Sequence, residues 1–264
     1  MERDELIERI ADVLRAEPMV RAAWLVGSIG RGTDDEYSDV DVWAVVAPED
    51  IDAFAEAWPE ASGKVADIVL RQGLGKRIFT HVTADWLRFD LSVGTPDDVS
   101  ERPRDAVRPL FDHDGLADRL GDEGPPLAPS ADRVAALSTE FLRVLGLLPV
   151  VLGRREYVVA AAGAGLLRTL LIRLYTEDVA VADRGGALHL AALLPPERYE
   201  ALAALPPVEA TRESALRFHV ACAELFLPVA RELAARSGAD WPQALEDAAL
   251  RHLERDLDVK LARD

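Results

Sequence analysis

A segment rich in Pro and Gly, residues 121–130, separates two parts of the chain that have different sequence patterns. Pro and Gly at this density support neither helix nor strand, so the segment is expected to be a linker. Before it, short runs alternate apolar and polar residues, as half-buried strands do; after it, Ala and Leu recur at helical spacing. The sequence therefore predicts an α/β domain over residues 1–121, a linker over 122–131 and an all-α helical bundle over 132–264.

Periodicity also predicts the individual elements. In the first part, an amphipathic helix is expected over 4–16 and short helices over 29–32 and 116–120. Strands are expected over 22–26, 38–46, 65–70, 77–83, 86–93 and 108–111. In the second part, helices are expected over 130–152 with Ser130 as N-cap, over 155–175, after the Pro195–Pro196 pair, over 208–235 and over 241–257.

Charge and cysteine content limit the partners and the compartment. The 264 residues include 30 Lys and Arg against 47 Asp and Glu, a net charge of −17. Binding to nucleic acid or to an anionic membrane is not expected, because both need a basic surface. A single cysteine, Cys222, excludes an intramolecular disulfide and a Cys-rich zinc site, which favours the cytoplasm. The acidic start is unlike a signal peptide, and the apolar stretches are broken by Pro149, Arg168 and Arg173, so buried helices rather than membrane spans are expected.

Most of the functional information lies in residues 25–43. A predicted strand ends at Gly27-Ser28, and a Gly-containing turn follows. Glycine lets a ligand approach the backbone closely, and the exposed N–H groups of such a turn favour an anion such as phosphate. Asp39 and Asp41 then occupy positions i and i+2 of the next strand, so both carboxylates are expected on one sheet face. Paired hard oxygen ligands favour Mg²⁺, which commonly shares its coordination with substrate phosphates.

This pattern of Gly-Ser, Arg-Gly and Ser-Asp-x-Asp on an apolar strand resembles the polymerase-β-like nucleotidyltransferase superfamily. More narrowly, the chain is similar to the small bacterial enzymes that modify aminoglycoside and lincosamide antibiotics. The resemblance implies an α+β catalytic domain with a mixed sheet, followed by helices. It also implies that Gly27 and Ser28 bind the triphosphate of a nucleoside triphosphate, and that Asp39 and Asp41 hold two magnesium ions.

In that superfamily a third acidic residue, on a later strand, binds metal or takes the proton of the acceptor hydroxyl. Asp90 is the residue that matches it, and Asp67 is the rival. An acid in mid-strand is costly unless it is solvated, paired or bound to metal, so an ion pair with Arg88 or Arg77 is the structural alternative.

Other residues have less specific patterns. Arg31 is a candidate for a phosphate contact or for an ion pair with the acids at 34–36, and Ser38 for the nucleotide site or a local turn hydrogen bond. The segment 154–157 is expected to open a bundle helix and to line a pocket or serve as a charged helix start. The five histidines show no metal-ligand spacing, and Gly163 and Gly165 suggest close helix packing.

The sequence thus predicts a Mg²⁺-dependent transfer of a nucleoside monophosphate onto a hydroxyl of a small molecule. The expected nucleotide is AMP. The small molecule could be an antibiotic, in which case the reaction would confer resistance. The helical part would contribute to the acceptor pocket, and a cytoplasmic homodimer is expected by analogy. Two alternatives stay open: modification of a protein, as antitoxin-type members do, and a non-catalytic nucleotide-binding module. The acceptor and the base of the nucleotide are not encoded in any pattern.

Overall fold

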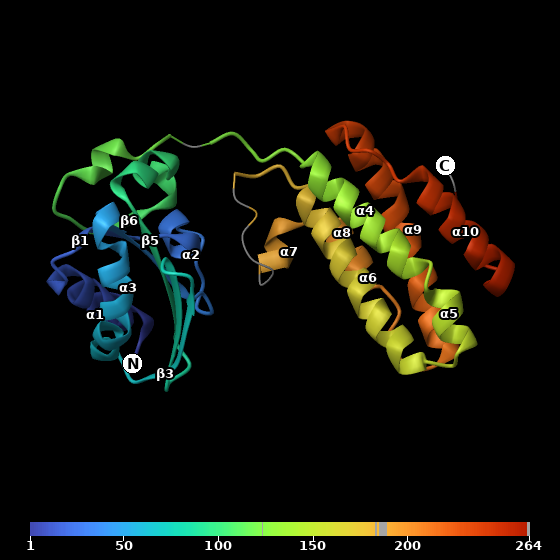
Figure 1. The fold of residues 1–264 in the computed structure, drawn as a ribbon, viewed down its shortest axis with the longest axis horizontal. Coiled ribbons are helices and arrows are strands. Elements are labelled where there is room, and N and C mark those ends of the chain that lie inside the picture. The colour runs from blue at the N-terminus through green and yellow to red at the C-terminus, as the bar shows by residue number, and fades with distance from the viewer. Residues whose placement is uncertain (123, 183, 185–188, 263–264) are drawn as a thin grey trace. The chain divides into compact units, whose positions relative to one another are not determined.

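The computed structural model describes residues 1–122, 124–182, 184 and 189–262, and divides into two compact units, Met1–Gly124 and Pro125–Asp264. The division falls in the Pro- and Gly-rich segment. The first unit contains the sheet and the second is helical (Figure 1).

A mixed six-stranded sheet with the order β3-β4-β5-β2-β1-β6 forms the centre of the first unit. The strands are β1 (Val20–Leu25), β2 (Val40–Val46), β3 (Ile68–Leu74), β4 (Ile78–Thr83), β5 (Arg88–Gly94) and β6 (Arg108–Asp112). Only the β2–β5 pair among them is parallel; the other neighbours are antiparallel. The predicted mixed sheet is therefore confirmed, and its one parallel pair joins the two strands that carry the candidate acids.

Helices α1 (Arg3–Ala16) and α3 (Ile51–Ala61) lie on one face of this sheet (Figure 1). The apolar stripe of α1 packs against β1, β2 and β6, and its buried side chains join the same core as the inward-facing residues of β2 and β5. Burial of a side chain of this size stabilises the fold by about 1.5–3 kcal/mol. Helix α3 was not predicted from the sequence, although Ile51, Phe54 and Trp58 follow a helical period.

The opposite face of the sheet is only partly covered. Trp24 and Trp43 stack there, with ring centroids 5.2 Å apart, among residues of the short connecting segments. The short elements of this unit are α2 (Gly27–Arg31) and the 3₁₀ helices η1 (Pro48–Asp50), η2 (Ser62–Lys64), η3 (Pro96–Glu101), η4 (Arg104–Ala106) and η5 (Leu116–Arg119). The uncovered part of this face is where the candidate acids lie.

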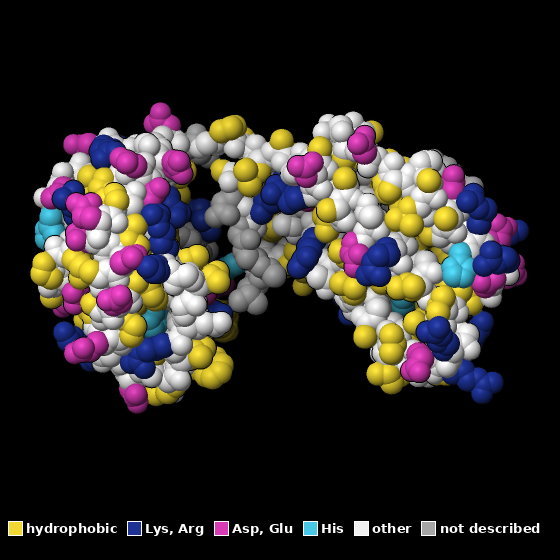
Figure 2. Space-filling model, in the orientation of Figure 1, with side chains coloured by type: hydrophobic (Ala, Val, Ile, Leu, Met, Phe, Trp, Pro, Cys, Tyr) yellow, Lys and Arg dark blue, Asp and Glu magenta, His cyan; other side chains and the backbone are white. Residues whose placement is uncertain are grey.

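The second unit is a bundle around its own apolar core. Its helices are α4 (Ala131–Leu145), α5 (Leu148–Gly153), α6 (Tyr157–Glu177), α7 (Leu190–Leu193), α8 (Pro196–Ala203), α9 (Arg212–Ser237) and α10 (Gln243–Leu257). Two segments, Ala131–Gly153 and Tyr157–Glu177, are long and apolar enough to cross a membrane by length and composition, and both contribute side chains to the bundle core. On the face shown in Figure 2, acidic and basic side chains are interspersed on both units.

Several predicted boundaries need correction. The helix expected over 130–152 is two helices, because the chain turns at Gly146–Leu147; Ser130 does cap the first, accepting from the Arg133 N–H. Helix α6 begins at Tyr157 rather than 155, since Arg155 has a positive φ of 62° that no α-helix accommodates. Strand β3 begins at Ile68 rather than 65. Gly165, expected in a close contact, has open space beside it.

Candidate active site

Two candidate acids lie side by side on the parallel strands β2 and β5, where Asp41 and Asp90 are register partners. Val40 and Val42 on β2, and Phe89 and Leu91 on β5, pack into the core beneath α1 and α3. Because side chains alternate along a strand, both carboxylates belong to the opposite, partly open face of the sheet. The structure thus places these two acids next to each other on one surface.

Asp39 lies just before β2, two residues from Asp41, and completes a group of three acids. Its carboxylate is 3.7 Å from the guanidinium of Arg88, and each of these side chains is 37% exposed. Arg88 is on β5, two residues before Asp90. A half-exposed pair at this distance is weak, so Arg88 can exchange Asp39 for another anion at little cost.

The proximity of the acids changes their protonation. Burial, followed by the charges of Asp39 and Asp90, raises the pKa of Asp41 from 3.8 to about 6, although Arg31 and Arg88 oppose the shift. Burial also raises the pKa of Asp90, and the charge of Asp39 adds to this, while a hydrogen bond from Thr80 and the charge of Arg88 lower it. The site therefore holds more negative charge than its own cations compensate.

The Gly-Ser pair follows β1 at the start of α2, with Gly27 at a positive φ of 63°. A Cβ at this glycine would lie 2.0 Å from Oδ2 of Asp41, so only glycine fits here. The backbone N–H of Val26 donates to the carbonyl of Asp41 (2.9 Å), which joins the turn to β2. The predicted phosphate turn and the predicted metal ligand are therefore in direct contact.

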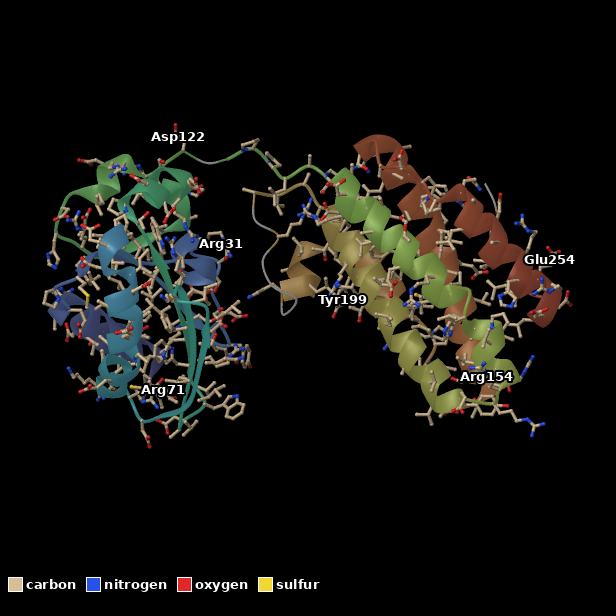
Figure 3. The ribbon with its side chains drawn as sticks, in the orientation of Figure 1. Arg31, Arg71, Asp122, Arg154, Tyr199 and Glu254 are labelled. Carbon is tan, nitrogen blue, oxygen red and sulfur yellow. The ribbon has the colours of Figure 1, made fainter. Side chains whose placement is uncertain are left out.

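Ser28 is buried, and its carbonyl accepts a hydrogen bond from the N–H of Thr33 (2.9 Å), which closes the turn after α2. Gly30 packs as closely, because a Cβ there would lie 2.4 Å from the carbonyl oxygen of Ala106. Figure 3 shows Arg31 on α2, and its charge acts on Asp41. The structure thus brings Gly27, Ser28 and Arg31 to the edge of the acid cluster.

Ser38 makes the local turn hydrogen bonds that were one of the two roles expected for it. Its hydroxyl donates to Oδ1 of Asp35 and accepts from the backbone N–H of Asp35, both at 3.0 Å. Asp34 in the same turn binds the guanidinium of Arg3 at 2.8 Å. These contacts fix the loop that leads into Asp39.

Asp67 is poorly placed as a third acid. It precedes β3, is exposed, and β3 is separated from β5 by β4. Its expected mid-strand character is wrong because the strand begins one residue later. Arg77 pairs with Asp98 (3.4 Å) and not with Asp90.

Two residues that interact with the acid cluster were not predicted as part of the site from the sequence. Arg88 was considered only as a structural partner of Asp90, yet it pairs with Asp39. Thr80 on β4 is the register partner of Asp90 and hydrogen-bonds to it. The alternation of β5 could have placed Arg88 on the acid face, whereas the register of β4 against β5 has no local sequence signal.

The acid cluster fits a magnesium ion that also contacts substrate. In the described ranges, no three His, Cys, Asp or Glu side chains are grouped so that they could hold a metal by themselves. Mg²⁺ usually binds one or two carboxylates and completes its octahedron with water and substrate phosphates. The all-oxygen set of Asp39 and Asp41, with incompletely compensated charge, has that chemistry.

The helical unit has a cavity of its own, of about 440 Å³, between α4, α6 and α7. The acid that lines it, Glu177, is held by Arg133 and Arg184, each at 2.9 Å. None of the carboxylates of the first unit lines this cavity. The carboxylate of Glu177 is therefore occupied by two ion pairs, and the acids on the sheet are the better candidates for catalysis.

Comparison with known protein families shows to which family the chain belongs. Residues 1–255 match the streptomycin adenylyltransferase family. The chain belongs to that family. The resemblance to drug-modifying nucleotidyltransferases predicted from the Gly-Ser and Asp-x-Asp motifs is thereby confirmed, and membership of the streptomycin adenylyltransferase family makes the chain a nucleotidyltransferase of the adenylyltransferase type.

Solved structures similar to this streptomycin adenylyltransferase family member include an aminoglycoside 6-adenyltransferase from Bacillus subtilis, at 16% identity and a TM-score of 0.42, covering 96% of this chain and 97% of that one. A nucleotidyltransferase-like protein from Exiguobacterium sibiricum has 15% identity and a TM-score of 0.37, covering 94% of this chain and 88% of that one. No curated protein matches the chain.

Only the second half of the segment 154–157 opens a helix as expected, with Glu156 as the N-cap of α6 and Tyr157 as its first residue. Arg154 ends α5 and lies at the turn to α6 (Figure 3), followed by Arg155 in the left-handed region. The two arginines thus form the turn between helices.

Proposed function

We propose that the protein is a Mg²⁺-dependent adenylyltransferase that moves AMP from ATP to a hydroxyl of an aminoglycoside antibiotic and releases pyrophosphate. Family membership supports the reaction type. The observation that carries the proposal is the contact of Gly27 with Asp41, whose neighbour across the parallel strands is Asp90. Phosphate-binding turn, metal ligand and third acid are then contiguous, as transfer of a nucleotidyl group requires.

Asp39 and Asp41 would hold the metal, and Asp90 lies beside Asp41 on the adjacent strand. When bound, Mg²⁺ would lower the pKa of the attacking hydroxyl and neutralise the charge that develops on the leaving pyrophosphate. The protein contributes rigidity, because Asp41 and Asp90 sit on adjacent strands whose other face is fully packed.

The triphosphate would lie along the turn that contains Gly27 and Ser28, where backbone N–H groups face an anion. Arg31 on α2 and Arg88 on β5 supply positive charge from both sides of the acids. Arg88 would leave Asp39 for a phosphate oxygen, since its present pairing is long and half-exposed.

Asp90 would take the proton of the acceptor hydroxyl. Its raised pKa makes it a stronger base than an ordinary carboxylate, and the hydrogen bond from Thr80 orients it. The acceptor oxygen then forms a bond to the α-phosphorus as the bond from that phosphorus to the β-phosphate oxygen breaks. The products are the adenylylated acceptor and pyrophosphate.

The remaining sequence predictions concern the assembly and its location. A homodimer in the cytoplasm is expected by analogy with drug-modifying relatives. Size-exclusion chromatography with light scattering on the full chain would check the oligomeric state.

Mass spectrometry tests the function directly. The protein is incubated with Mg²⁺, one of the four common NTPs and an aminoglycoside panel that includes streptomycin. The expected result is the mass of one AMP added to an aminoglycoside with ATP, and none with Asp41→Asn. Asp67→Asn is the matched control and should keep activity. Addition only to a protein, or to no compound with any NTP, would contradict the proposal.

A further inference from the structure

One tryptophan of this chain differs from the others in its environment. Trp86 exposes 76% of its surface, whereas Trp24, Trp43 and Trp58 are each 1% exposed. Trp241 is partly buried and donates its indole N–H to Glu246 (2.8 Å). A large aromatic ring in water contributes nothing to the core, so this ring is available to a bound partner.

The backbone of Trp86 is held in an unusual conformation. Its φ is 66°, in the left-handed region that large side chains rarely occupy. The turn is fixed by hydrogen bonds from the N–H of Trp86 to the carbonyl of Thr83 (2.9 Å) and from the N–H of Leu87 to the Thr83 hydroxyl (3.0 Å). Strained backbone of this kind is often retained at binding sites.

Trp86 lies at the end of the sheet where the acids are. It comes just before β5, two residues before Arg88 and four before Asp90. The adjoining Asp85 binds the amino terminus (3.2 Å), and Arg3 in the same N-terminal segment binds Asp34 in the loop before Asp39. The turn with Trp86 and the loop before β2 are thus anchored to the same few residues.

The geometry of the reaction indicates that Trp86 lies on the side of the site from which the acceptor approaches. In nucleotidyl transfer the attacking and leaving oxygens are roughly in line. The Gly27 turn, which would hold the leaving pyrophosphate, follows β1, and β2 separates β1 from β5 in the sheet. The acceptor must therefore approach from the β5 side, which is the side of Asp90 and Trp86.

We propose that Trp86 is a specificity-determining residue for the acceptor; this rests on the proposed function. Trp86 lies four residues before Asp90 and β5 begins only at Arg88, so the chain separates the two residues by at most about 13 Å. The indole would therefore stack on a ring of the acceptor other than the one that carries the reacting hydroxyl. A cationic or polyhydroxylated ring suits this contact, because cations and C–H groups are attracted to the face of an indole.

Three variants test the proposal. Trp86→Asn removes the ring and suits the positive φ, so the fold is kept; Trp86→Phe keeps a ring. Leu74→Ala, on edge strand β3 and 73% exposed, is the matched control for loss of an exposed apolar side chain. The measurements are kcat and KM for ATP and for streptomycin, and calorimetric affinity for streptomycin.

Trp86→Asn should raise the KM and the Kd for streptomycin about 10-fold. The KM for ATP should not change, Trp86→Phe should recover most of the affinity, and Leu74→Ala should behave as wild type. Unchanged streptomycin affinity in an active Trp86→Asn enzyme would overturn this inference alone, as would a rise confined to the KM for ATP, which would assign the ring to the nucleobase. A wild-type protein that adenylylates no aminoglycoside would overturn the proposed function, and the role of Trp86 with it.

Discussion

The backbone of Gly27 lies directly against the carboxylate of Asp41, so closely that a Cβ on the glycine would be 2.0 Å from Oδ2. The two residues belong to different motifs, the Gly-Ser turn after β1 and the Asp-x-Asp pair at the start of β2. Their contact sets the distance between the place proposed for phosphate and the place proposed for metal. The absence of a side chain at residue 27 is thus a requirement of the site.

Gly27→Ala should reduce kcat by at least about 100-fold, because the methyl group displaces the Asp41 carboxylate and a displaced group of this kind loses its positioning. The matched control is Gly75→Ala, which has the same positive φ of 63° but no atom within 4 Å of the added methyl. Gly75→Ala should keep activity although it carries the same backbone strain. Equal activity of the two variants would show that the contact is unimportant.

Asp41→Asn should abolish activity and make the folded protein more stable at pH 8. The pKa of Asp41 is raised to about 6, so the folded state is stabilised with this carboxyl protonated and loses that contribution as the pH rises through 6. Asparagine has nearly the same shape as the Asp41 side chain but carries no charge, so the folded state no longer contains a partly buried carboxylate beside two other acids. Urea denaturation at pH 8 without Mg²⁺ measures the change, and a less stable variant would contradict this reading of the cluster.

His81 should make the first unit sensitive to acid. Burial lowers the pKa of His81 from 6.5 to about 4, and its ring accepts from the Trp58 indole N–H (3.2 Å) and stacks on Phe89. The unfolded histidine takes up a proton near pH 6.5 and the folded one does not, so the free energy of unfolding falls as the pH drops from about 6.5 towards 4.

His81→Gln cannot take up a proton in this range and should flatten the dependence between pH 6.5 and 4.5, measured by urea denaturation. His113→Gln, at an exposed side chain, serves as the control. A pH profile identical in His81→Gln and wild type would rule out this origin of the acid sensitivity.

Glu177 should be a principal stabiliser of the helical unit. Its buried carboxylate accepts from the N–H of Ser130 (2.6 Å) and pairs with Arg133 and Arg184, the latter only 11% exposed. Glu177→Gln leaves Arg184 without its charge partner in a buried place, and should cost about 3 kcal/mol in the free energy of unfolding. Glu140→Gln breaks an exposed pair with Arg143 (2.7 Å) and should have a much smaller effect. Equal losses would contradict the role of burial.

Local patterns predicted the strand that carries Asp41, although β2 begins at Val40 and Asp39 lies just before it rather than within it. The alternation of Val40, Asp41 and Val42 predicts a strand and also the sheet face on which Asp41 lies. Because the two valines are buried in the core, the acid must lie on the opposite face. The Gly-Ser turn is equally local. These features depend on neighbours in sequence, which is why periodicity detects them.

Long-range features could not be predicted in the same way. The register that makes Asp41 the partner of Asp90 and places Thr80 beside it depends on strands far apart in the chain. Helix α3 was missed although its apolar residues are periodic, and Pro59 lies within its last turn. Arg155 lies in the turn between α5, which ends at Gly153, and α6, and its positive φ has no signal in a residue type that rarely adopts it.

Isothermal titration calorimetry with a non-hydrolysable ATP analogue, with and without Mg²⁺, tests the central claim most directly. The wild-type protein should bind the analogue at least about 10-fold more tightly with Mg²⁺, since Asp39 and Asp41 and the phosphates share the ion. Asp41→Asn should lose this gain while Asp67→Asn keeps it. Binding that is equally tight with and without Mg²⁺, or a gain that survives in Asp41→Asn, would contradict the assignment of the site.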